Sequence, residues 1–133
     1  DIREDCIKVA EKNLRRAGLS EFVTLTMMDA KDEINIRDAD AAMIDVGDPW
    51  SVVDTVWKTL KGGGLLSSLS PTMNQVEKIT IKLEESGFTD IESVELLLRN
   101  IEARYGKTRP AMRMIGHTAY LTFARKIIHN IKS

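Results

Sequence analysis

The sequence has few of the features that mark membrane, secreted or metal-binding proteins. Its 133 residues contain one cysteine, Cys6, so no internal disulfide can form, and we expect no metal site. No apolar run is long enough to span a bilayer and no signal-peptide pattern is present, so we expect a cytoplasmic protein without a membrane contact. No internal repeat is visible either. The remaining composition is that of one globular domain with a sizeable core.

The net charge of -1 conceals a basic final part of the chain. Residues 99–133 carry one acidic side chain, Glu102, against eight lysines and arginines, whereas residues 1–98 carry nineteen acids against eleven bases. A locally basic segment favours an anionic partner such as nucleic acid. A solvated basic surface explains the same pattern equally well, so charge alone leaves both interpretations open.

Hydrophobic periodicity predicts alternating helices and strands. Apolar residues three or four apart predict helices over 2–17 and 49–60, and a third between Thr72 and Gly87, where Thr72 and Gln75 form a capping box. Apolar runs predict strands over 22–28, 40–46, 64–69, 91–99 and 119–124, and the glycines 62–64 are interpreted as a turn. Since the last two strands are joined without a helix, we predict an α/β fold with a mostly parallel sheet and an antiparallel C-terminal strand.

Three aspartates fall where strands are expected to end. Asp29 and Asp45 each close a predicted strand, and Asp1 would close a strand that preceded the chain. Ligands bind at the carboxyl ends of strands in open α/β sheets, because loops and helix N-termini converge there. A row of three carboxylates at one edge therefore indicates a ligand site.

The stretch that contains Asp45 has two interpretations when it is taken alone. Asp45 could be a functional carboxylate or could simply end its strand. Asp48 and Pro49 have the chemistry of an ordinary helix start. Trp50 fits a packing residue of that helix at least as well as it fits a ligand contact.

Several segments together are similar to one known family. They are residues 1–5, 45–50, 60–64, 71–76, 109–110 and, most specifically, 116–121, which reads Gly-His-Thr-Ala-Tyr-Leu. With them the chain resembles class I S-adenosylmethionine-dependent methyltransferases, and among these the tRNA 1-methyladenosine methyltransferases that act on the T-loop. The resemblance implies a Rossmann-like fold in which residues 1–133 form the C-terminal part of a single catalytic domain. The N-terminal strands and the glycine-rich loop of that domain would then be missing from this chain.

The resemblance also implies roles for single residues. Asp1 would bind the ribose hydroxyls of S-adenosylmethionine, and Asp29 with the backbone of Ala30 would recognise its adenine. Asp45 corresponds to the active-site aspartate, between the cofactor and the target base. The residues expected to face RNA or a neighbouring subunit are Arg99, Arg104, Arg109, His117 and Thr118.

The implied reaction gives Asp45 a definite task. Methylation of an adenine ring nitrogen makes the exocyclic amine more acidic, so a carboxylate that accepts a hydrogen bond from this amine would orient the base and take its proton. The base would also have to leave its stacked loop, and Trp50 or Tyr105 could stack on it.

The partners implied are tRNA and further copies of the chain, since the family tends to form tetramers. Two alternative functions stay open at this point. One is a non-catalytic partner that keeps the RNA-binding and oligomer-forming surfaces. The other is a small-molecule methyltransferase of the corrin-ring type, which should lack the segment 116–121.

Overall fold

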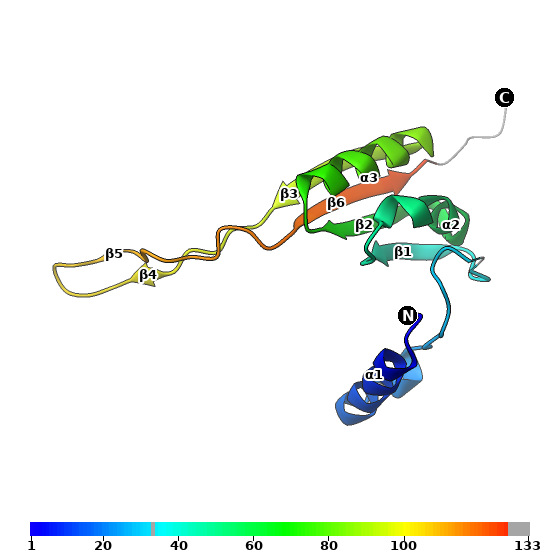
Figure 1. Cartoon of the computed structure of the whole chain (residues 1–133), viewed down its shortest axis with the longest axis horizontal. Coiled ribbons are helices and arrows are strands. Elements are labelled where there is room, and N and C mark those ends of the chain that lie inside the picture. The colour runs from blue at the N-terminus through cyan, green and yellow to red at the C-terminus, as the bar shows by residue number, and fades with distance from the viewer. Residues whose placement is uncertain (33, 128–133) are drawn as a thin grey trace. The chain divides into compact units, whose positions relative to one another are not determined.

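The structure, a computed structural model, describes residues 1–32 and 34–127. The chain divides into two compact units, Asp1–Asn35 and Ile36–Ser133, which we call the N-terminal unit and the sheet unit (Figure 1). The N-terminal unit consists of a helix followed by an extended segment. The sheet unit contains a four-stranded sheet, its helices and a long hairpin.

Helix α1, Glu4–Ala17, forms most of the N-terminal unit. Acidic side chains in its first turn and Arg15 and Arg16 in its last turn complement the helix dipole. Gly18 ends the helix in the left-handed conformation, with φ of 69°, and its N–H bonds to carbonyls of the last turn. The predicted helix over 2–17 is therefore confirmed, with its first turn at Glu4.

The predicted strand over 22–28 is wrong as secondary structure. Ser20–Phe22 forms a short 3-10 helix, η1, and the residues after it are extended without a strand ladder. The Asp1 nitrogen donates to the Thr26 carbonyl at 3.3 Å, and the Met28 N–H donates to the Asp1 carbonyl at 3.1 Å. These two bonds have the pattern of a parallel strand pair, but the pair is one residue long. Alternating side chains predict the extended backbone correctly, whereas a strand also needs a partner of several residues.

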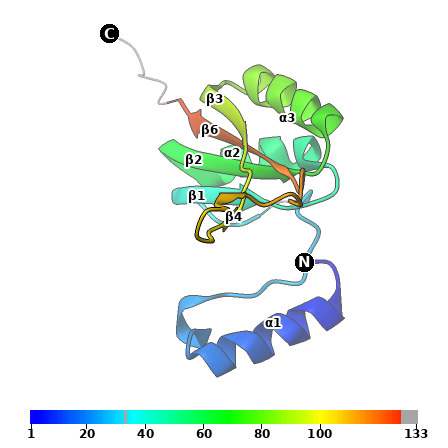
Figure 2. The same ribbon diagram turned by 90° about the vertical axis from the view of Figure 1, so that its left-hand side faces the viewer.

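The sheet unit is built on four strands in the order β1-β2-β6-β3 (Figure 2). β1 and β2 are parallel, and β6 is antiparallel to both of its neighbours, β2 and β3. Three strands thus share one direction and the last strand opposes them, which confirms the predicted mixed sheet. The bounds are Ala39–Ile44 for β1, Leu60–Ser70 for β2, Phe88–Glu95 for β3 and Tyr120–Lys126 for β6.

Two helices pack against this sheet and form its core. A 3-10 turn, η2 (Pro49–Val52), leads into α2 (Val53–Thr59), and α3 spans Met73–Glu85. None of the helices in the described residues is long and apolar enough to cross a membrane. Alternate strand residues face the helices, and the buried side chains of the two layers include Ile44, Leu66, Ala124, Val53, Val56, Ile79 and Leu83.

The glycine run belongs to β2, so its interpretation as a separate turn is wrong. Ala39 pairs with Leu60, and Ala41 pairs with Leu65, so β2 uses five residues where β1 uses two. The surplus residues form a bulge, and Gly63 within it has a φ of 78°, which favours glycine. Strand pairing therefore continues on both sides of the glycines.

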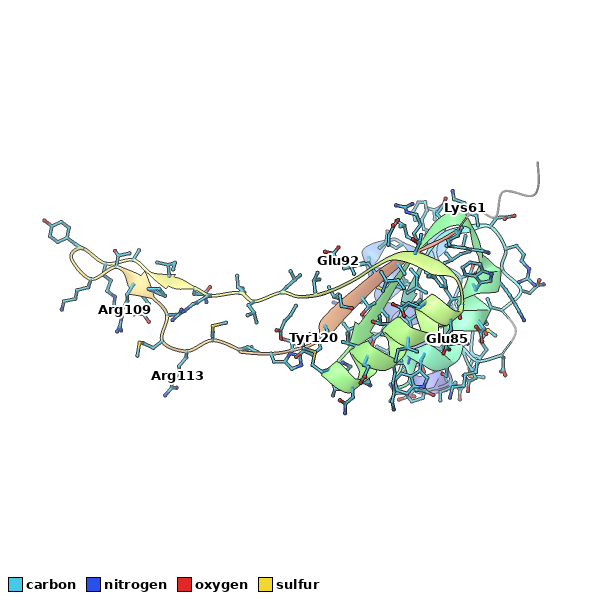
Figure 3. All side chains as sticks on the ribbon, turned by 90° about the horizontal axis from the view of Figure 1, so that it is seen from above. Lys61, Glu85, Glu92, Arg109, Arg113 and Tyr120 are labelled. Carbon is cyan, nitrogen blue, oxygen red and sulfur yellow. The ribbon has the colours of Figure 1, made fainter. Side chains whose placement is uncertain are left out.

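Residues 96–119, which we call the arm, extend away from the sheet between β3 and β6 (Figures 1 and 3). The arm carries a small hairpin of β4 (Ile101–Glu102) and β5 (Arg109–Pro110). The connecting turn contains Gly106 with φ of 67°. The basic stretch between the last two long strands is thus a hairpin.

Candidate active site

One edge of the sheet collects two of the residues that the sequence singles out, Asp45 and His117. Because β1, β2 and β3 share a direction, their carboxyl ends lie at the same edge, which is also where β6 begins. Asp45 follows β1, Pro71 follows β2, Glu95 ends β3, and His117 precedes β6. We call the region formed by these four residues the carboxyl edge.

Asp45 opens the first loop of the carboxyl edge, residues 45–48. Before the loop, Ile44 is 3% exposed and pairs with Ser68 of β2, and after it Pro49 is buried. The loop is therefore anchored at both ends. Asp45 itself is exposed, so its carboxylate is accessible to a ligand at this edge.

The side chain of Gln75 links this loop to the start of α3. Gln75 N–H donates to Thr72 Oγ1 at 3.4 Å and Thr72 N–H donates to Gln75 Oε1 at 3.1 Å, which confirms the predicted capping box. The Thr72 hydroxyl donates to the same Oε1 at 2.9 Å. At the other end of the amide, Nε2 donates to the Gly47 carbonyl at 2.9 Å. Two donors that face Oε1 and one acceptor that faces Nε2 therefore fix the orientation of this amide.

His117 joins three strand ends at the carboxyl edge. Its Nδ1 donates to Glu95 Oε1 at 2.6 Å and its Nε2 donates to the Pro71 carbonyl at 2.7 Å. The hydrogen bonds to the carboxylate and then to the carbonyl raise the pKa of His117 above its usual value. The Tyr120 ring lies against the imidazole, with 4.5 Å between centroids. Since protein atoms engage both nitrogens, an RNA contact of His117 would use the ring face or displace one of these bonds.

Asp1, Asp29 and Ala30 belong to the N-terminal unit. The bonds of Asp1 to Thr26 and Met28 bring the start of the chain beside the extended segment that ends at Asp29. Two of the three expected strand-end carboxylates thus lie in one unit, Asp1 beside the extended segment and Asp29 after it.

The basic residues of the arm fall into two groups. Arg99 Nε donates to the Ala111 carbonyl at 3.2 Å, and Arg109 donates through Nε and Nη2 to Glu102 Oε2, each at 3.2 Å. These two guanidinium groups stabilise the hairpin. The remaining cations are exposed and form no ion pair in the part of the chain that the structure describes: Arg104, Lys107 and Arg113.

The two aromatic residues expected to stack on a base lie in different places. Trp50 is half-buried in η2, and Lys78 Nζ of α3 lies 4.7 Å from its ring centroid. Tyr105 lies in the turn of the arm with its whole ring exposed. Thr118 is exposed next to His117. Trp50 therefore has a packing partner within the sheet unit, as the simpler interpretation expects.

Comparison with known proteins decides the family. Residues 1–109 match the family described as "tRNA methyltransferase complex GCD14 subunit". The chain belongs to the GCD14 family. The match includes Asp45, the capping box and most of the arm, and it confirms the resemblance inferred from the sequence.

Known relatives of this GCD14-family chain are similar over almost all of its length. The tRNA (adenine(57)-N(1)/adenine(58)-N(1))-methyltransferase TrmI of Methanocaldococcus jannaschii is 36% identical, over 94% of this chain and 54% of the relative. A solved tRNA (m1A58) methyltransferase TrmI from Aquifex aeolicus is 36% identical with a TM-score of 0.86, over 96% of this chain and 52% of the other. A SAM-dependent O-methyltransferase from Thermotoga maritima is 40% identical with a TM-score of 0.92, over 99% of this chain and 50% of the other.

These likenesses show that the GCD14-family chain has a Rossmann-like methyltransferase fold. The chain spans about half the length of the Methanocaldococcus jannaschii relative. The names of the two solved structures place the methyl group on different acceptor atoms, an adenine nitrogen and an oxygen.

The adenosine-binding residues expected from the resemblance have suitable chemistry. Asp1 Oδ1 and Asp29 Oδ1 each accept the N–H of the residue two positions later, at 2.9 Å. Among the described residues, neither the second oxygen of each carboxylate nor the Ala30 N–H forms a hydrogen bond. Free carboxylate oxygens accept ribose hydroxyls or an adenine amine, and a free N–H suits a ring nitrogen. The residues present thus fit the adenosine part of S-adenosylmethionine.

Proposed function

We propose that this GCD14-family protein transfers a methyl group from S-adenosylmethionine to nitrogen 1 of an adenine in the tRNA T-loop. The observation that carries the proposal is the family match over residues 1–109, which includes the exposed Asp45 at the carboxyl edge. Two relatives whose names specify this reaction add support.

In this proposal the cofactor supplies a methyl group bonded to a positively charged sulfur. The neutral thioether that remains is a good leaving group. Asp1 would hold the ribose hydroxyls, and Asp29 with the backbone of Ala30 would hold the adenine. The protein then mainly has to align the target nitrogen with the methyl carbon.

Asp45 would orient the target base and remove a proton from it. The Asp45 carboxylate would hold the base so that its nitrogen 1 faces the methyl group that the cofactor would supply. The methylated ring carries a positive charge, which acidifies its exocyclic amine. A hydrogen bond from this amine to the Asp45 carboxylate is strengthened as the charge develops, and the carboxylate can accept the proton.

The arm would supply the RNA-binding surface. Arg104, with the neighbouring exposed cations, would contact phosphates, and Tyr105 could stack on an unpaired base. Arg99 and Arg109 would act from the hairpin that they stabilise, and His117 and Thr118 from its base. We further propose assembly with other copies of the chain, as a tetramer, and a cytoplasmic location shared with the tRNA.

The test is methylation of T-loop tRNA by the protein at its full natural length, with 1-methyladenosine measured by nucleoside mass spectrometry. We expect Asp45→Ala to lower kcat by roughly a hundredfold, the scale of a lost general base. Asp45→Asn, which keeps an acceptor oxygen for the amine but loses the basicity, should fall between wild type and Asp45→Ala.

Asp40→Asn is the matched control, because Asp40 is an exposed aspartate on β1, the strand before Asp45, and forms an ion pair with Lys61. It should keep kcat within about twofold of wild type. Wild-type kcat in the Asp45→Ala variant would refute the role of Asp45. Methylated product on an oxygen would refute the choice of acceptor atom and favour the reaction named for the Thermotoga maritima relative. No methylated adenine at all would refute the proposed function.

A further inference from the structure

The loop that carries Asp45 is fixed at its ends but weakly restrained in its middle. Ile44 and Pro49 are buried on either side. Between them Gly47 has no side chain to pack, and glycine has the largest backbone freedom. The Asp48 carbonyl is held at the far end of the loop by Ser51, whose Oγ donates to it at 2.7 Å. The hydrogen bond from Gln75 Nε2 to the Gly47 carbonyl, at 2.9 Å, ties the middle of this loop to α3.

Helix capping alone does not explain the amide at this position. In a capping box, glutamate and glutamine both accept the N–H of the N-cap residue, and a negative charge in the first turn also favours the helix dipole. Glutamate would therefore cap α3 at least as well as Gln75 does. Only the amide has a donor for the Gly47 carbonyl, since a carboxylate oxygen would be repelled by it.

We propose that Gln75 is a positioning residue for Asp45. Its Oε1 holds the start of α3 through Thr72, and its Nε2 holds the Gly47 carbonyl, so the helix serves as the support for the loop. Asp45 lies two residues before Gly47 and takes its orientation from this tie. The inference rests on the proposed function of Asp45 and extends it to a residue outside the loop.

The sharpest test is Gln75→Glu in the full-length protein, because the change keeps the size of the side chain and the cap, removes the donor and adds a charge that a control can match. We expect kcat for adenine methylation to fall by roughly ten- to a hundredfold, since displacement of a reacting group by about 1 Å has effects of this size. The KM for tRNA should change less than about threefold, because the arm is far along the chain and is untouched. A purely structural role would lower the folded fraction and leave kcat per folded molecule unchanged.

Asn74→Asp is the matched control. It makes the same amide-to-acid change in the same helical turn, at an exposed side chain without a hydrogen bond in the described part of the chain. We expect its kcat within about twofold of wild type. An equal loss of kcat in both variants would assign the effect to charge and overturn the proposal.

Hydrogen exchange gives a second readout that does not depend on catalysis. In Gln75→Glu the amides of residues 46–48 should exchange at least about tenfold faster, while those of α3 stay as protected as in wild type. Unchanged exchange at 46–48 together with wild-type kcat would overturn the proposal.

Two further results separate this inference from the proposed function. If the wild-type protein methylates no adenine, the proposed function fails, and exchange at residues 46–48 alone then decides whether Gln75 holds the loop. If Gln75→Glu does not fold, Gln75→Met removes the same donor without adding a charge. Wild-type kcat and exchange in Gln75→Met would refute the positioning role.

Discussion

The two hydrogen-bond partners of the His117 imidazole determine which protonation state satisfies both contacts. A carboxylate oxygen lies 2.6 Å from one nitrogen, and a carbonyl oxygen lies 2.7 Å from the other. Neither neighbour donates a proton when Glu95 is ionised, and a neutral imidazole carries only one N–H. Both contacts are therefore satisfied together only by the protonated ring.

This geometry predicts a pH dependence. The folded-state pKa of His117 lies above its unfolded value of about 6.5, so its contribution to stability is complete below that value and is lost as pH rises through the folded pKa. An NMR titration of the ring protons should show a midpoint above about 6.5. The signal is assigned by its absence in His117→Asn.

Glu95→Gln is the companion variant, because it keeps an acceptor oxygen and removes the charge. Its His117 midpoint should move down toward the ordinary value, and its loss of stability relative to wild type should be largest at low pH. A His117 midpoint at or below about 6.5 in the wild-type protein would contradict the paired hydrogen bonds of His117 to Glu95 and Pro71, which we call the His117 bridge.

Single residues also show where sequence reasoning stops. Spacing identifies Thr72 and Gln75 as a capping box, because the two partners are three positions apart on one helix. The bond from Gln75 to Gly47 and the bond from His117 to Glu95 join residues that are 28 and 22 positions apart. Only the packing of the sheet brings such pairs together. For the bond from Gln75 to Gly47, the one signal in the local sequence is that position 75 holds glutamine and not glutamate.

At the scale of elements, β2 depends on a glycine that admits no side chain. A Cβ on Gly64 would lie 2.9 Å from the Lys61 carbonyl oxygen and 3.2 Å from that of Ala39. We expect Gly64→Ala to destabilise the fold by about 1–3 kcal/mol, since backbone atoms of two strands would have to shift. Chemical denaturation of the full-length protein measures the change.

Gly47→Ala is the comparison variant. A Cβ there meets no atom within 4 Å, and its φ is not in the left-handed region. Stability should stay within about 1 kcal/mol of wild type, with a gain favoured by the less flexible unfolded chain. Equal losses in the two alanine variants would show that crowding in the bulge is not the cause.

The elements differ in how well their sequences determine them. The predicted helices α1 and α3 are confirmed because caps and apolar spacing lie within each segment, as Gly18 shows for α1. The helix predicted over 49–60 begins as the 3-10 turn η2 and is α-helical only over Val53–Thr59. The extended residues after η1 have the alternation of a strand, but their pairing is limited to Asp1. Likewise, the three glycines suggest a turn, and only the partner strand β1 shows that they form a bulge. The strand predicted over 22–28 fails because a strand ladder depends on a second segment.

At the scale of the whole molecule, the basic charge is concentrated in the arm. Among its exposed cations, Arg104, Lys107 and Arg113 have no acidic partner in the described residues. If the arm binds tRNA, replacing these three by alanine should weaken binding and reduce the salt dependence. For every phosphate that the variant no longer neutralises, the slope of log affinity against log salt should become shallower by about 0.7–0.9. Fluorescence anisotropy with labelled tRNA at several salt concentrations measures this slope.

The control removes three exposed cations of α1 by changing Lys8, Lys12 and Arg16 to alanine. This variant should retain most of the wild-type slope. Equal slopes for the arm variant and wild type would mean that the arm cations are only solvated, which is the simpler interpretation of the charge pattern.

The His117 bridge also has a mechanical meaning. It stands where the arm joins the sheet, with Glu95 on the outgoing chain and His117 on the returning one. The hairpin lies on one side of this pair of hydrogen bonds, and Pro71 and β6 lie on the other. We therefore expect the two hydrogen bonds of His117 to limit how far a displacement of the hairpin reaches the carboxyl edge, and loss of the ring proton would remove one of the two.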